Sequence, residues 1–338
     1  MIETNALNDL KDIFHQSPKE LLILTHKNPD GDAVGSSLGL MHFLSDLGHN
    51  CKVLVPNNFP VFLSWLPGAE SIYIFEKDQE LGKALLNKAD VIFCLDFNSL
   101  SRISVIEQFI RATTCRRVLI DHHPQPDNDF DIKISNTGVS STAELVYHAI
   151  EQCGFGDKIS SNMATCFYTG IMTDTGNFSH NSSQPETFQA ASALLSKGID
   201  KDRIYSGIFH SHSFNRMRLM GYSLNDKLKY FPEFNTAYIS LSLRDLESFG
   251  FQPGDTEGFV NLPLSIDGVK FSALFIEKEE LIKVSLRSKG NFDVNALARK
   301  HFKGGGHKNA AGGESRISLD GTLQKFEKLL LEYNEELS

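Results

Sequence analysis

The sequence predicts an α/β protein, with an N-terminal domain built on a parallel sheet and a smaller α+β domain after it. The chain has 338 residues, which is more than one ordinary domain and suits two. Short apolar runs alternate with helical patterns through the first half, which is typical of a parallel sheet covered by helices on both faces. After Pro232 the pattern changes to longer strands with fewer helices, and this change marks the second domain.

Five apolar runs predict the strands of the first sheet, because each has the length and composition of a buried strand. These runs are Leu21–Thr25, Lys52–Val55, Ser71–Phe75, Val91–Leu95 and Arg117–Ile120. Helical patterns cover Asp32–Leu47 and Leu81–Asn87 between them. The chain turns helical from Ser141, where Ser141 and Glu144 have the spacing of a capping box, with Thr142 as the other candidate for the cap.

Further helical patterns lead into the second domain. They cover Ser160–Met172, Pro185–Lys197, Lys201–His210 and Ser213–Tyr230, and we interpret the last as a long polar helix that connects the domains. Strands are predicted at Thr236–Leu241, Val269–Glu277 and Leu281–Arg287, and helical contexts at Leu262–Ile266, Val294–Phe302 and Leu323–Tyr333. The predicted division is therefore 1–210, a connector at 211–231, and 232–338.

Composition and charge exclude several classes of protein. Hydrophobic residues make up 41% and charged residues 22%, unlike a disordered, collagen-like or coiled-coil chain. No stretch reaches the roughly 18 to 20 apolar residues of a membrane helix, and the N-terminus lacks a signal-peptide pattern.

The five cysteines form no CxxC pair, which favours free thiols in a reducing compartment. We expect a cytoplasmic protein without a membrane partner. A net charge of −9 argues against coating long nucleic acids, although it permits short oligonucleotides in a local basic groove.

Acidic and histidine side chains follow three predicted strands at the point where each strand ends. They are His26, Asp30 and Asp32 after the first strand, Asp96 after the fourth, and Asp121, His122 and His123 after the fifth. A further carboxylate, Asp174, follows the helical pattern that ends at Met172. Because ligands of open α/β sheets bind beyond the carboxyl ends of the strands, we expect these side chains to gather there.

This set supplies enough imidazoles and carboxylates for two divalent ions. A shared carboxylate offsets the repulsion between two cations, and metals roughly 3.5–4 Å apart are the standard clamp for phosphoryl transfer. Imidazole ligands favour Mn²⁺, Fe²⁺ or Co²⁺ over Mg²⁺. The structural alternatives are an N-cap for Asp96 and a turn for Asp30–Asp32. A purely structural role would have to apply separately to each of these residues, although all of them are expected at one edge of the sheet. The pattern therefore favours a metal centre.

The same residues carry a family resemblance. The segment His26–Ser36, Asp96, Asp121-His122-His123 and Asp174 resemble the four ordered motifs of the DHH phosphoesterase superfamily. Gly304-Gly305-Gly306-His307 followed by Ala310-Ala311-Gly312 resembles the signature of the DHH-associated C-terminal domain. The match spans about Leu21 to Gly313, and no motif residue is substituted.

The resemblance implies a role for each motif residue in the first domain. One Mn²⁺ would be held by His26, Asp30 and Asp96. A second Mn²⁺ would be held by Asp32, Asp96, His122 and Asp174, with Asp96 as the bridge. The implied catalytic residues are Asp96, Asp121 and His123. Asp121 would orient His122, and His123 would contact the scissile phosphate or act as an acid near the leaving group.

The resemblance also implies the substrate and the reaction. Substrate binding would fall to Arg287, Ser288, Gly304, Gly305, Gly306 and His307, with the active site in the cleft between the domains. A hydroxide activated by two metals would hydrolyse short oligoribonucleotides, linear dinucleotides such as pApA, and 3′-phosphoadenosine 5′-phosphate (pAp), as in the nanoRNase and pAp phosphatase type. The activity would be that of a 3′-5′ exoribonuclease or of a nucleotide phosphatase. The alternatives are an exopolyphosphatase, a pyrophosphatase-like hydrolase, and a nucleotide-binding regulator without turnover. No obligate protein partner is evident, and a homodimer is left open.

Overall fold

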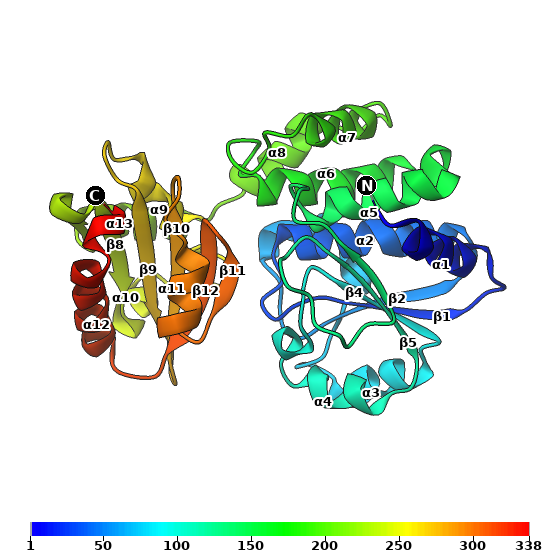
Figure 1. Ribbon diagram of the computed structural model, residues 1–338, viewed down its shortest axis with the longest axis horizontal. Helices are drawn as coiled ribbons and strands as arrows, with labels where there is room; N and C mark the ends of the chain where they lie inside the picture. Colours follow the sequence, from blue (N-terminus) through cyan, green and yellow to red (C-terminus); the bar gives the residue numbers. More distant parts are fainter. Residues whose placement is uncertain (1, 338) are drawn as a thin grey trace. The chain divides into compact units, whose positions relative to one another are not determined.

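The chain folds into two compact units, Met1–Ser211 and His212–Ser338, in a computed structural model that describes residues 2–337 (Figure 1). Each unit contains a six-stranded sheet of its own. The first sheet is parallel throughout, and the second is mixed. The predicted α/β class, with a separate α+β region after the parallel sheet, is therefore confirmed.

The first sheet contains all five predicted strands and one more. Its strands are β1 (Glu20–Leu24), β2 (Asn50–Val55), β3 (Tyr73–Ile74), β4 (Val91–Leu95), β5 (Arg116–Asp121) and β6 (Ile132–Ser135). They lie in the order β3-β2-β1-β4-β5-β6. The additional strand β6 has four residues in which isoleucine alternates with polar side chains, so it lacks the apolar run by which the other strands were predicted.

The centre of this sheet is a topological switch point. β1 and β4 are neighbours, while the chain continues from β1 to β2 on one side and from β4 to β5 on the other. Ligands of doubly wound sheets bind outside the carboxyl ends of the strands at such a point. The residues that follow β1 and β4, His26 and Asp96 among them, therefore lie where the topology favours a site.

Helices cover both faces of the parallel sheet (Figure 1). One face packs against α1 (Thr4–His15), α2 (Gly31–Asp46), α5 (Thr142–Ile150) and α6 (Ser161–Asp174). The other face packs against α3 (Gln79–Lys88) and α4 (Ile106–Ala112). Two more helices, α7 (Pro185–Leu195) and α8 (Lys201–Phe209), complete the helical layer over α6.

Two glycines let α2 and α6 pack closely together. A Cβ on Gly35 of α2 would lie 2.5 Å from the Cys166 carbonyl oxygen and 2.9 Å from the Gly170 nitrogen of α6. These separations are too short for any side chain larger than hydrogen. The close packing brings the first turn of α2, with Asp32, near the last turn of α6, with Asp174.

The second unit is built around a sheet in the order β11-β12-β10-β9-β8-β7. Its elements are α9 (Phe214–Asn225), β7 (Leu228–Phe231), β8 (Thr236–Leu241), α10 (Leu243–Ser248), β9 (Phe271–Glu277), β10 (Ile282–Ser288), α11 (Val294–His301), β11 (Gly305–His307), β12 (Ala310–Ser315), α12 (Leu319–Glu332) and α13 (Asn334–Leu337). Only β8 and β9 pair in parallel among the described strands of this sheet.

The long connecting helix predicted for 213–230 is wrong in its extent. The helix α9 ends at Asn225, and Leu228–Phe231 forms the edge strand β7, which pairs with β8. Leu219 of α9 is fully buried against Ile239 and Leu241 of β8. The apolar spacing that suggested one long helix therefore belongs to a short helix and a strand that both pack on the second sheet.

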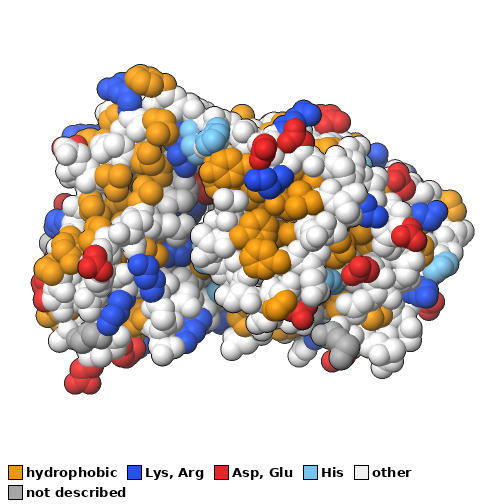
Figure 2. Space-filling view, turned by 90° about the horizontal axis from the view of Figure 1, so that it is seen from above, with side chains coloured by type: hydrophobic (Ala, Val, Ile, Leu, Met, Phe, Trp, Pro, Cys, Tyr) orange, Lys and Arg blue, Asp and Glu red, His pale blue; other side chains and the backbone are white. Residues whose placement is uncertain are grey.

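Hydrophobic side chains also lie on the surface of the first unit, over its outer helices (Figure 2). Phe188 and Leu195 of α7 are 52% and 39% exposed. Among the described residues, no helix combines the length and the apolar character needed to span a membrane.

Candidate active site

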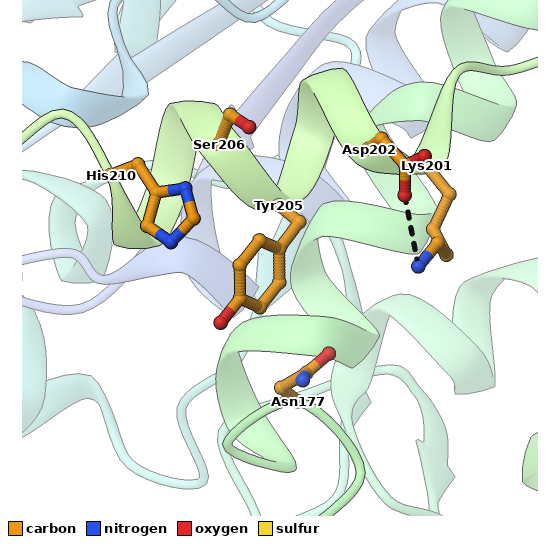
Figure 3. Close-up of a pocket in the computed structure, with 6 residues that line it drawn as sticks. All are labelled: Asn177, Lys201, Asp202, Tyr205, Ser206 and His210. Carbon is orange, nitrogen blue, oxygen red and sulfur yellow. Dashed lines mark ion pairs between the residues drawn. The ribbon is translucent and has the colours of Figure 1, made fainter.

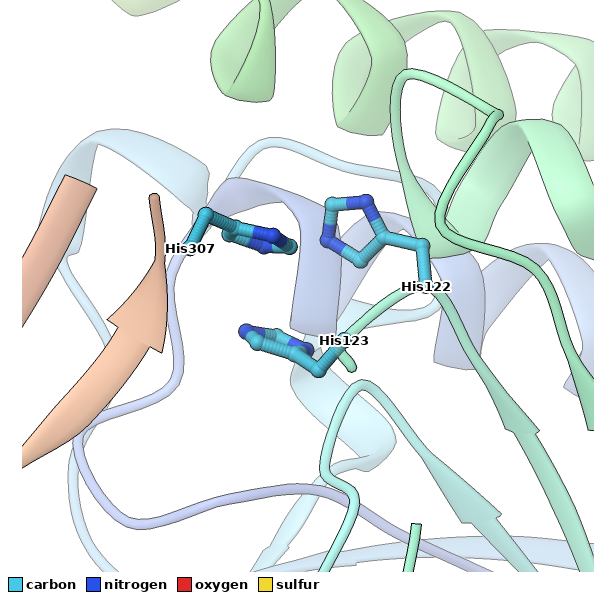
Figure 4. A group of neighbouring side chains, drawn as sticks. All are labelled: His122, His123 and His307. Carbon is cyan, nitrogen blue, oxygen red and sulfur yellow. The ribbon is translucent and has the colours of Figure 1, made fainter. Parts of the chain in front are cut away.

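The first unit brings all of the predicted acidic and histidine residues to one edge of its sheet. His26 follows β1, Asp96 follows β4, and Asp121 is the last residue of β5. Figure 4 shows His122 and His123 at the point where the chain leaves β5. Asp30 is the N-cap of α2, Asp32 lies in its first turn, and Asp174 ends α6.

His26, Asp30 and Asp96 form one potential metal-binding group. The His26 Nε2 atom lies 3.3 Å from Asp96 Oδ2 and 3.9 Å from Asp30 Oδ1. One ligand atom from each residue lies within 4.8 Å of the others. His26 and Asp96 are buried, whereas Asp30 is partly exposed, so the group opens to solvent on one side.

Asp32, His122 and Asp174 form a second potential group. The His122 Nε2 atom lies 3.5 Å from Asp174 Oδ2 and 3.9 Å from Asp32 Oδ2. The same Nε2 atom is 3.6 Å from Asp96 Oδ1. Asp96 therefore presents Oδ2 to the first group and Oδ1 to the second, as a bridging carboxylate would. The assignment of the individual metal ligands stays a prediction.

Asp96 has an unusual backbone conformation for a side chain at a strand end. Its φ is +64°, in the left-handed region that few non-glycine residues adopt and that aspartate and asparagine tolerate best. The turn directs the chain sharply away from β4 and leaves the buried carboxylate between the two groups. Local strain of this kind is common at functional sites.

Asp121 bonds to a different histidine from the one predicted. Its Oδ1 atom accepts a hydrogen bond of 2.7 Å from Nδ1 of His123, whereas the family resemblance implied that Asp121 would orient His122. The other oxygen, Oδ2, is buried and has no hydrogen-bond partner among the described residues. Both histidines directly follow Asp121 at the end of β5. The path of the backbone after β5 determines which of the two imidazoles forms a hydrogen bond with Asp121.

The charges of the cluster favour bound cations. Burial raises the pKa of Asp32 well above its usual range, and the nearby carboxylates of Asp96 and Asp174 raise it further. Burial opposes charge on His26, but its hydrogen bond with Asp96 and the negative charges of Asp30 and Asp96 together outweigh burial and raise its pKa. Burial likewise opposes charge on Asp96, yet the same hydrogen bond and the charges of His26, His123 and His122 together hold the pKa of Asp96 below its usual range.

Buried carboxylates that repel one another are stabilised by cations. The donor set combines imidazole nitrogens with carboxylate oxygens, which suits Mn²⁺, Fe²⁺ or Co²⁺. The unpartnered Oδ2 of Asp121 adds a buried acceptor beside these groups. The residues present therefore fit divalent metal ions.

The N-terminus of α5 holds two of the clustered carboxylates. The backbone N–H groups of Thr142 and Ala143 donate to Oδ2 and Oδ1 of Asp32, over 2.7 and 2.8 Å. The Thr142 hydroxyl donates to Oδ1 of Asp96 over 3.0 Å. Ser141 is the N-cap, as the sequence predicted, because its hydroxyl accepts from the Glu144 N–H. Thr142 was considered only as a cap, so sequence reasoning missed its contact with Asp96.

We expect Thr142→Val to weaken Mn²⁺ binding by about 10- to 100-fold, which is the usual effect of losing a hydrogen bond to a metal ligand. Valine keeps the shape of threonine but removes the hydroxyl that orients Asp96. Isothermal titration with Mn²⁺ measures the change. Thr142→Ser keeps the hydroxyl and should bind Mn²⁺ almost as wild type does. Equal affinity of the valine variant and wild type would contradict a positioning role for Thr142.

The predicted substrate residues of the second unit lie on β10 and β11. Arg287 is the penultimate residue of β10 and is partly buried. The hydroxyl of Ser288 donates to the Phe292 carbonyl and accepts from the Asn309 amide, so it ties two turns together. His307, which is also drawn in Figure 4, ends the short strand β11. The substrate contacts of these residues stay predictions.

Two of the three glycines before His307 belong to the strand β11, and Gly304 directly precedes it. Gly305, Gly306 and His307 pair with β12 in an antiparallel register. A Cβ on Gly304 would lie 1.9 Å from the Gly312 carbonyl oxygen, and one on Gly306 would lie 2.4 Å from that of Ala310. The close approach of the chain at β12 therefore explains why positions 304 and 306 are glycine.

A surface pocket of about 470 Å³ lies beside α8 in the first unit (Figure 3). Its lining residues are Asn177, Lys201, Asp202, Tyr205, Ser206 and His210. Lys201 pairs with Asp202 over 3.1 Å, so the only lysine of the lining is already balanced by a carboxylate. None of the predicted site residues lines this pocket, and we place the active site at the carboxylate cluster.

Two family models and several relatives match this chain. The model of the DHH family, N-terminal domain, covers residues 20–171, and that of the DHHA1 domain covers residues 235–337. A protein of Thermus thermophilus named bifunctional oligoribonuclease and PAP phosphatase NrnA is 31% identical, over 94% of this chain and 90% of its own. The Bacillus subtilis protein of the same name is 27% identical, over 93% and 95%.

A solved structure extends the comparison to the fold. The crystal structure of an exopolyphosphatase-related protein from Bacteroides fragilis is 44% identical and superposes with a TM-score of 0.94. The match covers 100% of this chain and 98% of that one. The chain belongs to the DHH family of phosphoesterases, with a DHHA1 domain after its DHH domain.

Proposed function

We propose that this protein is a Mn²⁺-dependent phosphoesterase that hydrolyses short oligoribonucleotides and pAp. The observation that carries the proposal is the position of Asp96, whose two oxygens face two separate groups of histidine and carboxylate ligands. The choice of substrate is supported by relatives named for oligoribonuclease and PAP phosphatase activity that match over most of the chain.

The first unit would hold two ions. His26, Asp30 and Asp96 would ligate one, and Asp32, Asp96, His122 and Asp174 would ligate the other. Two ions bound there would lower the pKa of a water molecule and stabilise negative charge on phosphoryl oxygens. The N-terminus of α5 keeps Asp32 and Asp96 in place through the Thr142 and Ala143 contacts.

His123 is proposed to act directly on the substrate. Asp121 accepts a hydrogen bond from Nδ1 of His123, which fixes the tautomer and the plane of the ring. Burial lowers the pKa of His123, although Asp121 partly offsets this effect. Its Nε2 atom would then contact the scissile phosphate or pass a proton to the leaving oxygen.

The second unit is proposed to bind the nucleotide part of the substrate. Arg287 would contact a phosphate or a base, and His307 would add a side-chain donor. Seven lysines and arginines lie between Lys283 and Lys308 against one acid, Asp293, in a chain of net charge −9. This local excess of positive charge supports an anionic ligand.

A substrate panel tests the choice of substrate. We expect kcat/KM for pApA and pAp to exceed that for pyrophosphate and polyphosphate in one buffer with Mn²⁺. An exopolyphosphatase is the second candidate, because the 44% identical structure is described as exopolyphosphatase-related. A preference for polyphosphate over every nucleotide would favour this candidate and contradict our proposal.

We expect chelation with excess EDTA to abolish activity and added Mn²⁺ to restore it. Because His26 and His122 would be ligands, Mn²⁺ or Co²⁺ should support higher activity than Mg²⁺ at equal concentration. Steady-state rates on pApA across a metal titration measure this order. Full activity in excess EDTA would contradict metal-dependent hydrolysis, and a clear preference for Mg²⁺ would contradict the imidazole ligands.

A further inference from the structure

Arg102 lies in a segment that is fastened to the edge of the candidate active site. The short helix η3 (Leu100–Ile103) begins four residues after Asp96. The Lys27 N–H donates to the Arg102 carbonyl over 2.8 Å, which ties η3 to the residue after His26. The same segment is tied to the chain after His123, because the Asn98 side chain donates to the Pro124 carbonyl over 2.6 Å. Arg102 is therefore placed between the ends of β1 and β5.

The guanidinium of Arg102 has no partner among residues 2–337. It makes no hydrogen bond, ion pair or ring contact in this part of the chain, although the residue is partly buried. Arg111, Arg116 and Arg117 of the same unit all have side-chain partners, and Arg203 is exposed to solvent. Arg111 pairs with Glu107 and Asp129, and Arg116 pairs with Asp9. A partly desolvated cation without a counterion is unfavourable unless an anion binds to it.

The charge of Arg102 acts on two histidines of the cluster. Burial is the main cause that lowers the pKa of His123, and the positive charge of Arg102 lowers it further. Arg102 also opposes protonation of His26, although nearby carboxylates outweigh it there. These effects agree with the backbone contacts, which fasten the Arg102 segment to the chain next to His26 and His123.

We propose that Arg102 binds a non-bridging oxygen of the phosphoryl group that is cleaved. This inference rests on the proposed phosphoesterase function. A guanidinium matches the geometry of a phosphate through two parallel N–H donors, and its charge is independent of pH. Arg102 belongs to the same unit as the proposed metal ligands, whereas Arg287 belongs to the second. Arg102 therefore acts on any phosphate ester that reaches the metal centre, including one without a nucleotide.

Three variants test this proposal. Arg102→Gln removes the charge and keeps much of the length, Arg102→Lys keeps the charge but not the fork, and Arg111→Gln is the matched control on an exposed arginine of the same unit. We measure kcat/KM on pApA and on bis-p-nitrophenyl phosphate, competitive inhibition by inorganic phosphate, and Mn²⁺ affinity by isothermal titration.

Arg102→Gln should lower kcat/KM by about 10- to 150-fold on both substrates, as expected for the loss of one charge-assisted contact. It should weaken inhibition by inorganic phosphate to a similar degree and leave Mn²⁺ affinity within about twofold. Arg102→Lys should recover part of the loss, and Arg111→Gln should resemble wild type. Thermal denaturation shows whether each variant is folded, and Arg102→Lys provides the comparison if the glutamine variant unfolds.

Several outcomes would overturn the proposal. Wild-type rates in Arg102→Gln would remove any role in phosphate binding. Loss of bound Mn²⁺ would assign Arg102 to the metal centre instead. A loss on pApA alone would place Arg102 against the nucleotide and not the cleaved phosphoryl group. The rates on bis-p-nitrophenyl phosphate and the inhibition by inorganic phosphate can be measured whatever the natural substrate is. These two measurements therefore test the role of Arg102 even if the proposed nucleotide substrate is wrong.

Discussion

Asp96→Asn should lower turnover by several orders of magnitude while the protein stays folded. The two carboxylate oxygens of Asp96 face His26 and His122 at 3.3 and 3.6 Å, so both proposed ions would lose a negatively charged ligand. Asparagine has nearly the same shape and tolerates the φ of +64° at this position, which alanine does less well. Steady-state rates in saturating Mn²⁺ measure the loss, and the number of bound ions is counted by metal analysis.

Stability provides the second readout for this variant. The pKa of Asp96 lies below its usual range, because His26 and the neighbouring histidines favour its charged form, so this charge stabilises the folded, metal-free protein. The metal-free variant should therefore unfold at a lower temperature than wild type, while it stays folded under the conditions of the assay. Asp157→Asn, at an exposed position of the same unit, is the matched control and should keep wild-type rates. Near wild-type activity in the purified, metal-replete Asp96→Asn protein would defeat the assignment of Asp96 as the bridge.

Arg287→Ala should lower kcat/KM on dinucleotides by about 10- to 200-fold, from a charge-assisted contact worth roughly 1.5–3 kcal/mol. Hydrolysis of bis-p-nitrophenyl phosphate should fall much less, because this small ester makes few of the contacts that a nucleotide makes. The proposed metal ligands all lie in the first unit, so bound Mn²⁺ should be unchanged. Rates on both substrates and Mn²⁺ titrations measure these effects.

The control for Arg287 is Arg316→Ala, on a side chain that is 70% exposed in the same unit. It should leave both rates unchanged, because exposed ion pairs contribute little. Equal losses on the two substrates in Arg287→Ala would mean that Arg287 supports the reaction itself. Loss of bound Mn²⁺ would mean that it supports the fold or the metal centre. Either result would contradict a division of work between the two units, and equal losses would give Arg287 the pattern that is expected of Arg102.

The sequence by itself determined the class of the fold and the set of residues that gather in the first unit. The apolar runs of β1, β4 and β5 are local patterns, and the polar residues that follow them are visible without any knowledge of pairing. Parallel strands end at one edge of a sheet, so the convergence of His26, Asp96 and Asp121 follows from the pattern. The family was also evident from these residues, because their order along the chain is distinctive.

The tertiary structure decided which of these groups touch. Thr142 and Asp32 are 110 residues apart, and their hydrogen bond depends on how α5 packs against α2. The choice of His123 over His122 as the partner of Asp121 depends on the path of the chain after β5. The need for glycine at position 306 of β11 arises from the closely packed strand β12, which follows in the sequence but is not an apolar run. Contacts of this kind depend on how helices and strands pack against one another. The hydrophobic periodicity of a single helix or strand does not predict them.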